Sequence, residues 1–116
     1  MKEKIIEIEK INIEYKIGEN QWENDKLIDE GEEEDIWYHN GITSSCHVLC
    51  KLPQNVKIGR KMRKVIIKEG AKLCKYHTKK TRSEHLTEII YTQLKNVKKT
   101  QIAGRVIAEE TKSIIV

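Results

Sequence analysis

A short segment, residues 32–53, carries many of the side chains in this chain that could do chemistry. Cys46, His47 and Cys50 are potential metal ligands, and Asp35 and His39 are a potential acid–base pair. Residue types alone would therefore allow either a metal site or a catalytic site here. The spacing of these residues along the predicted strands and helix decides whether they form a metal site, a catalytic site or part of the structure.

The spacing of the two cysteines argues against a metal ion. Cys46 and Cys50 fall within a predicted strand, where a rise of about 3.3 Å per residue places them on one face but about 13 Å apart. Zinc sites usually draw paired ligands from a C-x-x-C turn. Cys74 and His77 could add ligands from a helix, but they lie on its apolar side, where both residue types usually serve packing. We expect no metal ion and no cofactor.

A catalytic site is equally poorly supported. Asp35 and His39 are four residues apart on a predicted strand, too far for a direct hydrogen bond. Cysteine–histidine pairs can be drawn, but none comes with a motif that positions a nucleophile. The sequence also has no glycine-rich phosphate loop. We expect the protein not to be an enzyme.

The elements that position these residues follow from the hydrophobic pattern. Residues 5–18 alternate as one strand, or as two with a break near Glu9–Lys10, and a helix covers 60–79. We also expect a short helix within 19–31, strands at 35–39, 45–52 and 86–92, a turn or short helical piece at 93–100, and a terminal hairpin at 104–116. This order predicts a single α+β domain over residues 1–116, with a mainly antiparallel sheet covered by one long amphipathic helix plus a short helix.

Charge is distributed unevenly along the chain. The net charge is +4, but residues 1–50 hold 5 Lys against 13 Asp and Glu, whereas residues 51–116 hold 17 Lys and Arg against 5 Glu. Such an asymmetry indicates either an anionic partner or two halves that neutralise each other in the fold.

The helix at 60–79 separates its residue types by face. Met62, Ile66 and Leu73 lie within one apolar arc. The opposite arc holds Lys61, Lys64, Lys68, Lys72, Lys75 and Lys79. Like charges at this spacing destabilise a helix slightly, so the stripe is either an ordinary solvated face or a binding surface for phosphates.

Two further basic groups lie in the same half of the chain. Lys95, Lys98 and Lys99 would share one side of a helical turn, and Lys79, Lys80 and Arg82 follow the long helix. Each group alone means little. Together they favour a polyanion as the partner, and a nucleic acid in particular.

One ordered pattern runs from about residue 18 to the C-terminus. It has an Asn-Asp pair, an Asp-aliphatic-Trp-aromatic-His strand, a His-Val strand, a Tyr-Thr pair, Val-Lys-Lys and a glycine. Its positions are Asn24, Asp25, Asp35, Trp37, His39, His47, Val48, Tyr91, Thr92, Val97, Lys98, Lys99 and Gly104. In this pattern the chain resembles the NFACT RNA-binding domain family. Ser45-Cys46 departs from the usual Gly-Ser, which suggests that Cys46 is a small packing residue.

The resemblance implies non-catalytic binding of nucleic acid, RNA rather than DNA, with tRNA or rRNA as candidates and a possible association with the ribosome in translation quality control. Affinity is expected from Lys64, Lys68, Lys72, Lys95, Lys98 and Lys99. Trp37, His39 and His47 are either core residues or a surface on which a base stacks. The alternative function is a protein-interaction module that docks on an acidic or ribosomal partner.

The compartment follows from what the sequence lacks. It has no run of 18 apolar residues, and its first ten residues have no apolar signal-peptide core. Three cysteines, an odd number, suit reduced thiols. We expect an intracellular protein, cytoplasmic or nuclear, with no membrane partner.

Overall fold

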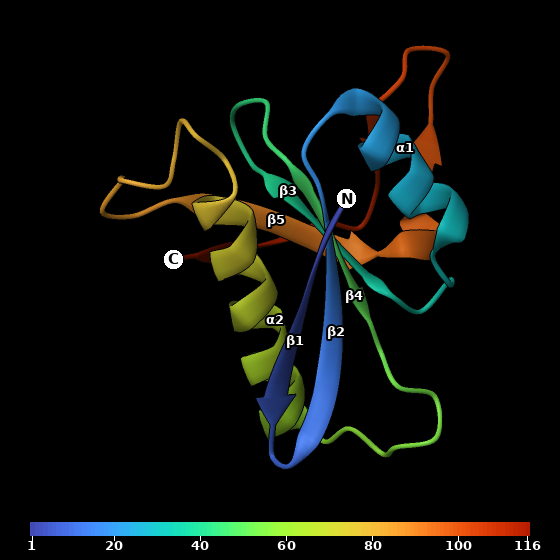
Figure 1. The fold of residues 1–116 in the computed structure, drawn as a ribbon, viewed down its shortest axis with the longest axis vertical. Coiled ribbons are helices and arrows are strands. Elements are labelled where there is room, and N and C mark those ends of the chain that lie inside the picture. Colours follow the sequence, from blue (N-terminus) through green and yellow to red (C-terminus); the bar gives the residue numbers. More distant parts are fainter.

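A computed structural model describes residues 1–116 as a three-layer α+β structure (Figure 1). The middle layer is a six-stranded sheet in the order β1-β2-β4-β3-β5-β8, and all of its neighbouring strands are antiparallel. The helix α2 (Arg60–Tyr76) covers one face. The helix α1 (Gln21–Glu30) and the small hairpin of β6 (Val97–Lys99) and β7 (Val106–Ala108) cover the other face. The predicted fold class is therefore confirmed.

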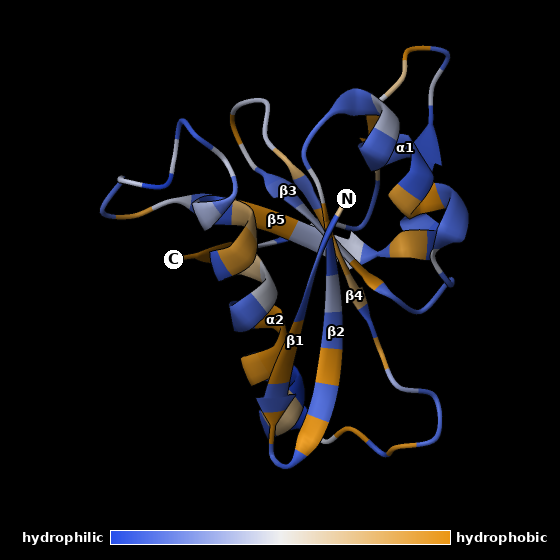
Figure 2. Ribbon diagram, in the orientation of Figure 1, coloured by the Kyte–Doolittle hydropathy of each residue, from blue (hydrophilic) through white to orange (hydrophobic).

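The first two strands form a hairpin. β1 (Lys2–Ile8) and β2 (Ile11–Gly18) are joined by Glu9 and Lys10, which both have positive φ, as a tight two-residue hairpin turn requires. The break expected at this point is confirmed. Figure 2 shows the alternation of apolar and polar residues along β2, whose buried side chains Ile13, Tyr15 and Ile17 face α2.

The α2 helix packs closely on the sheet through a glycine. A Cβ at Gly70 would lie 2.2 Å from the Tyr38 ring, so only glycine lets the helix approach so near. The hydroxyls of Tyr15 and Tyr38 both donate to the Ile66 carbonyl, at 2.7 Å and 3.2 Å. The helix ends at Tyr76, three residues earlier than predicted.

The early end of α2 has a local cause. Past Tyr76, the Thr78 hydroxyl donates to the Cys74 carbonyl at 2.8 Å, and the Thr81 hydroxyl donates to the Lys75 carbonyl at 2.9 Å. These side chains satisfy carbonyls that a longer helix would have bonded through its backbone.

The central strands carry the residues of the candidate site. They are β3 (Ile36–Asn40), β4 (His47–Lys51) and β5 (Glu88–Gln93). Successive side chains point to opposite faces, so Tyr38 and Val48 face α2, whereas Trp37 and Leu49 face α1. On the α1 side a second core of five residues forms, from Leu27, Trp37, Leu49, Leu94 and Val97.

The predicted terminal hairpin over residues 104–116 is wrong. β7 pairs with β6, whereas β8 (Lys112–Ile115) joins the main sheet beside β5. The two strands separate near Glu110, which has a φ of 54°. The Thr92 hydroxyl lies within hydrogen-bond distance of the Glu109 and Glu110 carbonyls, at 3.0 Å and 3.2 Å, and ties the turn to β5.

Candidate nucleic-acid interface

The lysine face of α2 lies on the outside of the molecule. Lys61, Lys64 and Lys68 are exposed, and no ion pair involves any of them. Lys72 is half-buried and lies 3.7 Å from the Glu69 carboxylate. Lys79 lies beyond the helix end. The α2 lysine face, which we define as Lys61, Lys64 and Lys68, is thus a positive stripe without ion pairs, although Glu7, Glu9 and Glu69 line a shallow hollow beside Lys61.

The second lysine group has a different geometry from the predicted one. Lys95 belongs to the 3₁₀ turn η1 (Leu94–Asn96), and Lys98 and Lys99 are neighbours on β6. Neighbours on a strand point to opposite sides, so these three lysines do not share one side of a helical turn, and that prediction is wrong. Lys95 lies 3.6 Å from Glu34, and Lys99 lies 2.7 Å from Asp29, whose hydrogen bond raises the pKa of the Lys99 ammonium.

Trp37, His39 and His47 form one cluster on the α1 side of the sheet. The rings of Trp37 and His39 are parallel, with centroids 5.7 Å apart, and the His47 ring meets both edge-on. Trp37 and His47 are each only 1% exposed, so neither ring has a free face, whereas His39 is half-buried. The lysine face of α2 is on the other side of the sheet, so the structure does not bring the aromatic cluster and that lysine face together.

Hydrogen bonds fix the protonation of His47. The Trp37 indole N–H donates to His47 Nδ1 at 3.1 Å, which requires that nitrogen to be unprotonated. Burial, with a smaller contribution from His39, lowers the pKa of His47 to about 3. The backbone N–H of His47 donates in turn to Asn24 Oδ1 at 3.3 Å, which links the cluster to α1.

The residues that first suggested metal binding or catalysis have structural roles. The buried Asp35 carboxylate accepts from the backbone N–H groups of Glu32 and Leu52 and pairs with Lys51 at 3.0 Å. Cys46 is buried, and its Sγ lies 3.3 Å from the Thr78 hydroxyl oxygen. No three His, Cys, Asp or Glu side chains gather in a way that could hold a metal ion.

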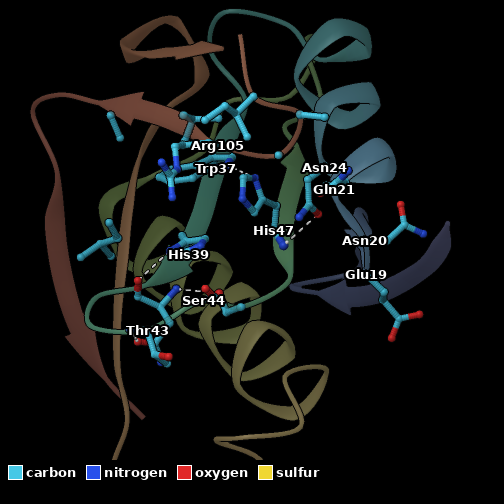
Figure 3. A pocket seen from close by; sticks show the side chains of 18 of the residues that line it. Glu19, Asn20, Gln21, Asn24, Trp37, His39, Thr43, Ser44, His47 and Arg105 are labelled. Atoms are coloured by element: carbon cyan, nitrogen blue, oxygen red, sulfur yellow. Dashed lines mark hydrogen bonds between the residues drawn. The ribbon is translucent and has the colours of Figure 1, made fainter. Parts of the chain in front are cut away.

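A hollow of about 740 Å³ opens beside the aromatic cluster (Figure 3). It lies between the start of α1, the β3–β4 turn (residues 41–46) and the β6–β7 connection (residues 100–105). His39, Trp37 and His47 belong to its lining, together with Arg105, which the sequence analysis did not single out. In the sequence, Arg105 was marked only by its position directly after Gly104, which belongs to the family pattern.

Side-chain hydrogen bonds hold the walls of this hollow in place. Asn40 Oδ1 accepts from the backbone N–H groups of Ile42 and Thr43, at 2.8 Å and 2.9 Å, and shapes the β3–β4 turn. Asp25 Oδ1 accepts from the Gly104 N–H at 2.9 Å and holds the β6–β7 connection against α1. Gly104 has a φ of +80°, and a Cβ there would lie 2.7 Å from Gln21 Cβ. The hollow is therefore preformed.

Comparison with known proteins agrees with the resemblance in the sequence. The model of the NFACT protein RNA binding domain matches residues 10–112. Coiled-coil domain-containing protein 25 of Danio rerio and that of Mus musculus are each 33% identical over 84 residues, 72% of this chain and 40% of theirs. The homologue in Dictyostelium discoideum is 30% identical over 100 residues, 84% of this chain and 48% of that one. The chain thus spans less than half the length of these relatives.

A solved structure has the same fold. It is the C-terminal part of the fibronectin/fibrinogen-binding protein from Streptococcus suis, which covers 90% of this chain with a TM-score of 0.74, and 41% of that chain is matched. Its sequence identity is 20%, so this likeness concerns the fold alone. The family match over residues 10–112 carries the assignment, and the chain belongs to the NFACT protein RNA binding domain family.

Proposed function

We propose that this protein binds RNA without catalysing a reaction on it, and that the α2 lysine face supplies most of the affinity. Membership of an RNA-binding domain family supports the general role. The single observation that carries the choice of surface is that Lys61, Lys64 and Lys68 are exposed without an acidic partner. Unpaired ammonium groups on a rigid helix can neutralise phosphates and release their counterions.

The other lysines are expected to contribute less. Lys95 and Lys99 already pair with carboxylates, and Lys72 pairs with Glu69. A phosphate would have to compete with these carboxylates for the ammonium groups. Lys98, which is exposed on β6 without an ion pair, is the member of that group best placed to add a contact.

The direct test is RNA affinity after charge reversal on the helix. We expect the double variant Lys64→Glu/Lys68→Glu to weaken binding of a tRNA and of an rRNA fragment by at least about tenfold at low salt, because two phosphate contacts become repulsions. Both substituted positions are exposed, so the fold should be retained. Filter binding measures the affinities, and circular dichroism checks the fold.

Lys26→Glu is the control, and it is compared with the single variant Lys68→Glu, which changes the net charge by the same amount. Lys26 is exposed on α1, on the other side of the sheet, and its reversal should change RNA affinity far less. Equal losses in both variants would mean that net charge matters and the helix face does not. No detectable binding of any RNA by the wild type at low salt would refute the proposed function itself.

We extend the proposal to tRNA and rRNA at the ribosome as the RNA partners, and a tRNA and an rRNA fragment therefore serve as the test RNAs. Duplex DNA serves as the comparison, and we expect weaker binding to it than to RNA. No helix of the structure combines the length and apolarity needed to cross a membrane.

A further inference from the structure

The hollow beside the aromatic cluster is lined by both polar and apolar residues, and no residue of the α2 lysine face belongs to it. Two strongly exposed apolar side chains line it, Ile42 at 87% and Ile102 at 55% exposure. They come from two loops that wall the hollow, and His39 of β3 also lines it (Figure 3). Exposed apolar side chains together with a few polar groups are typical of a site for a small ligand.

His39 offers the hollow a free hydrogen-bond acceptor. Its Nδ1 lies 2.7 Å from the Asn40 carbonyl, which can only accept, so Nδ1 carries the proton. Nε2 of the neutral ring is then an acceptor, and no hydrogen bond within the protein uses it. Burial lowers the pKa of His39, so the ring is neutral at physiological pH. An acceptor in this place suits an amino group on the edge of a nucleobase.

Arg105 adds a charge for a phosphate. It is exposed, and no ion pair involves it. The neighbouring Gly104 is held against α1 by its hydrogen bond to Asp25, so the backbone that carries the Arg105 side chain has a defined position. Among the residues that line the hollow, the only full charges are Arg105 and Glu19. Glu19 lies 3.4 Å from Lys2 and 3.7 Å from His77, so Arg105 is the unpaired charge.

Volume and shape restrict what this chemistry can recognise. The hollow falls within the range of roughly 300–1,000 Å³ that is common for small ligands, which suits one nucleotide and not a helix. In an RNA duplex the base faces are stacked away, and only a single strand can extend a base into a pocket. An apolar wall, an edge acceptor and an arginine together match a base with its phosphate.

We propose that the hollow binds one unstacked nucleotide of single-stranded RNA, with the base between Ile42 and Ile102 at the edge of His39 and the phosphate at Arg105. This inference rests on the proposed function and adds a second contact that distinguishes RNA forms. The α2 lysine face holds any RNA backbone, and the hollow favours RNA with a free strand.

The test compares a short single-stranded RNA with a blunt RNA duplex. Arg105→Gln should weaken single-strand binding about tenfold, the usual effect of losing a charged hydrogen bond, and weaken duplex binding less than twofold. His39→Leu, which keeps an apolar contact with Trp37 but removes the acceptor, should act in the same direction. The control is Arg60→Gln, an exposed arginine at the start of α2, which should affect both RNA forms alike.

A second measurement does not depend on the α2 lysine face. Titration with 5′-AMP, followed by amide chemical shifts, should perturb residues 39–45 and 102–106 and leave those of α2 unchanged. If Arg105→Gln lowers single-strand affinity no more than Arg60→Gln and AMP shifts nothing in the hollow, this inference is wrong while the α2 interface stands. If AMP shifts the hollow but no RNA binds, the hollow is a nucleotide site and the proposed function fails.

Discussion

At the scale of single residues, His47 has a structural role, whereas His39 also keeps a ring nitrogen that can accept a hydrogen bond from a ligand. His47 accepts the Trp37 N–H and is buried, so it is a fixed neutral acceptor in the second core. His39 is held by the same stack but keeps one nitrogen free. The difference between these two rings, one fully buried and one half-buried, separates a packing residue from a candidate ligand contact.

Neutral His47 makes the stability of the fold depend on pH. Its pKa is about 3 in the folded state, whereas the unfolded chain has the ordinary value of 6.5. Below pH 6.5 the unfolded state therefore binds a proton that the folded state does not, and stability falls as the pH is lowered toward 3. We expect a loss of about 1.4 kcal/mol per pH unit from this group between about pH 6 and about pH 4.

Chemical denaturation across this pH range measures the effect. His47→Asn keeps an acceptor for the Trp37 N–H and removes the titrating group. The slope of its unfolding free energy against pH should therefore correspond to about one proton fewer than in the wild type. The control His85→Gln, which replaces an exposed histidine, should retain the wild-type slope. An unchanged slope in His47→Asn would show that His47 is not buried as a neutral ring.

At the scale of elements, the contact between α2 and the sheet depends on one missing side chain. Alanine normally stabilises a helix by about 1 kcal/mol relative to glycine. At Gly70 the added methyl would meet the Tyr38 ring, so we expect Gly70→Ala to destabilise the protein by about 1–3 kcal/mol instead.

The control for this prediction is Gly59→Ala at the start of the same helix. Nothing lies within 4 Å of a Cβ there, and the change should cost less than about 1 kcal/mol. Thermal or urea unfolding measures both variants. A Gly70→Ala protein as stable as the wild type would contradict the close packing of α2 on Tyr38.

How far the sequence could predict these elements depends on how local their causes are. The β1–β2 hairpin and α2 were predictable, because alternation and an apolar arc are properties of neighbouring residues. The C-terminal strands were not, because β7 is only three residues long and β8 pairs with β5, which lies far from it in the sequence.

The same distinction applies to the candidate site. Trp37, His39 and His47 were singled out because strands 35–39 and 45–52 were recognised. Arg105 and Ile102 were missed, because the hydrogen bond from Gly104 to Asp25 that brings their loop to α1 joins residues 79 positions apart in the chain. A sequence pattern over a short window contains no record of such a contact.

At the scale of the whole molecule, the fold brings the acidic and the basic half of the chain into contact. Three lysine ion pairs join the acidic first half to the basic second half: Lys51 with Asp35, Lys95 with Glu34, and Lys99 with Asp29. Part of the asymmetry is therefore neutralised within the fold. The α2 lysine face makes none of these ion pairs.

If both proposals hold, the two separate surfaces contact RNA in different ways. One is a charged helix face, and the other is a preformed hollow with a hydrogen-bond acceptor and an arginine. The first should respond strongly to salt, and the second should discriminate between strands and duplexes.

The measurement that tests the central claim most directly is the salt dependence of RNA binding by the wild type and by Lys64→Gln/Lys68→Gln. If the α2 lysine face neutralises phosphates, the logarithm of the affinity falls steeply with the logarithm of the salt concentration. The double variant should then have a slope shallower by about 1.4–2, since each lost lysine contact removes about 0.7–1. A wild-type slope near zero, or the same slope in both proteins, would contradict the account.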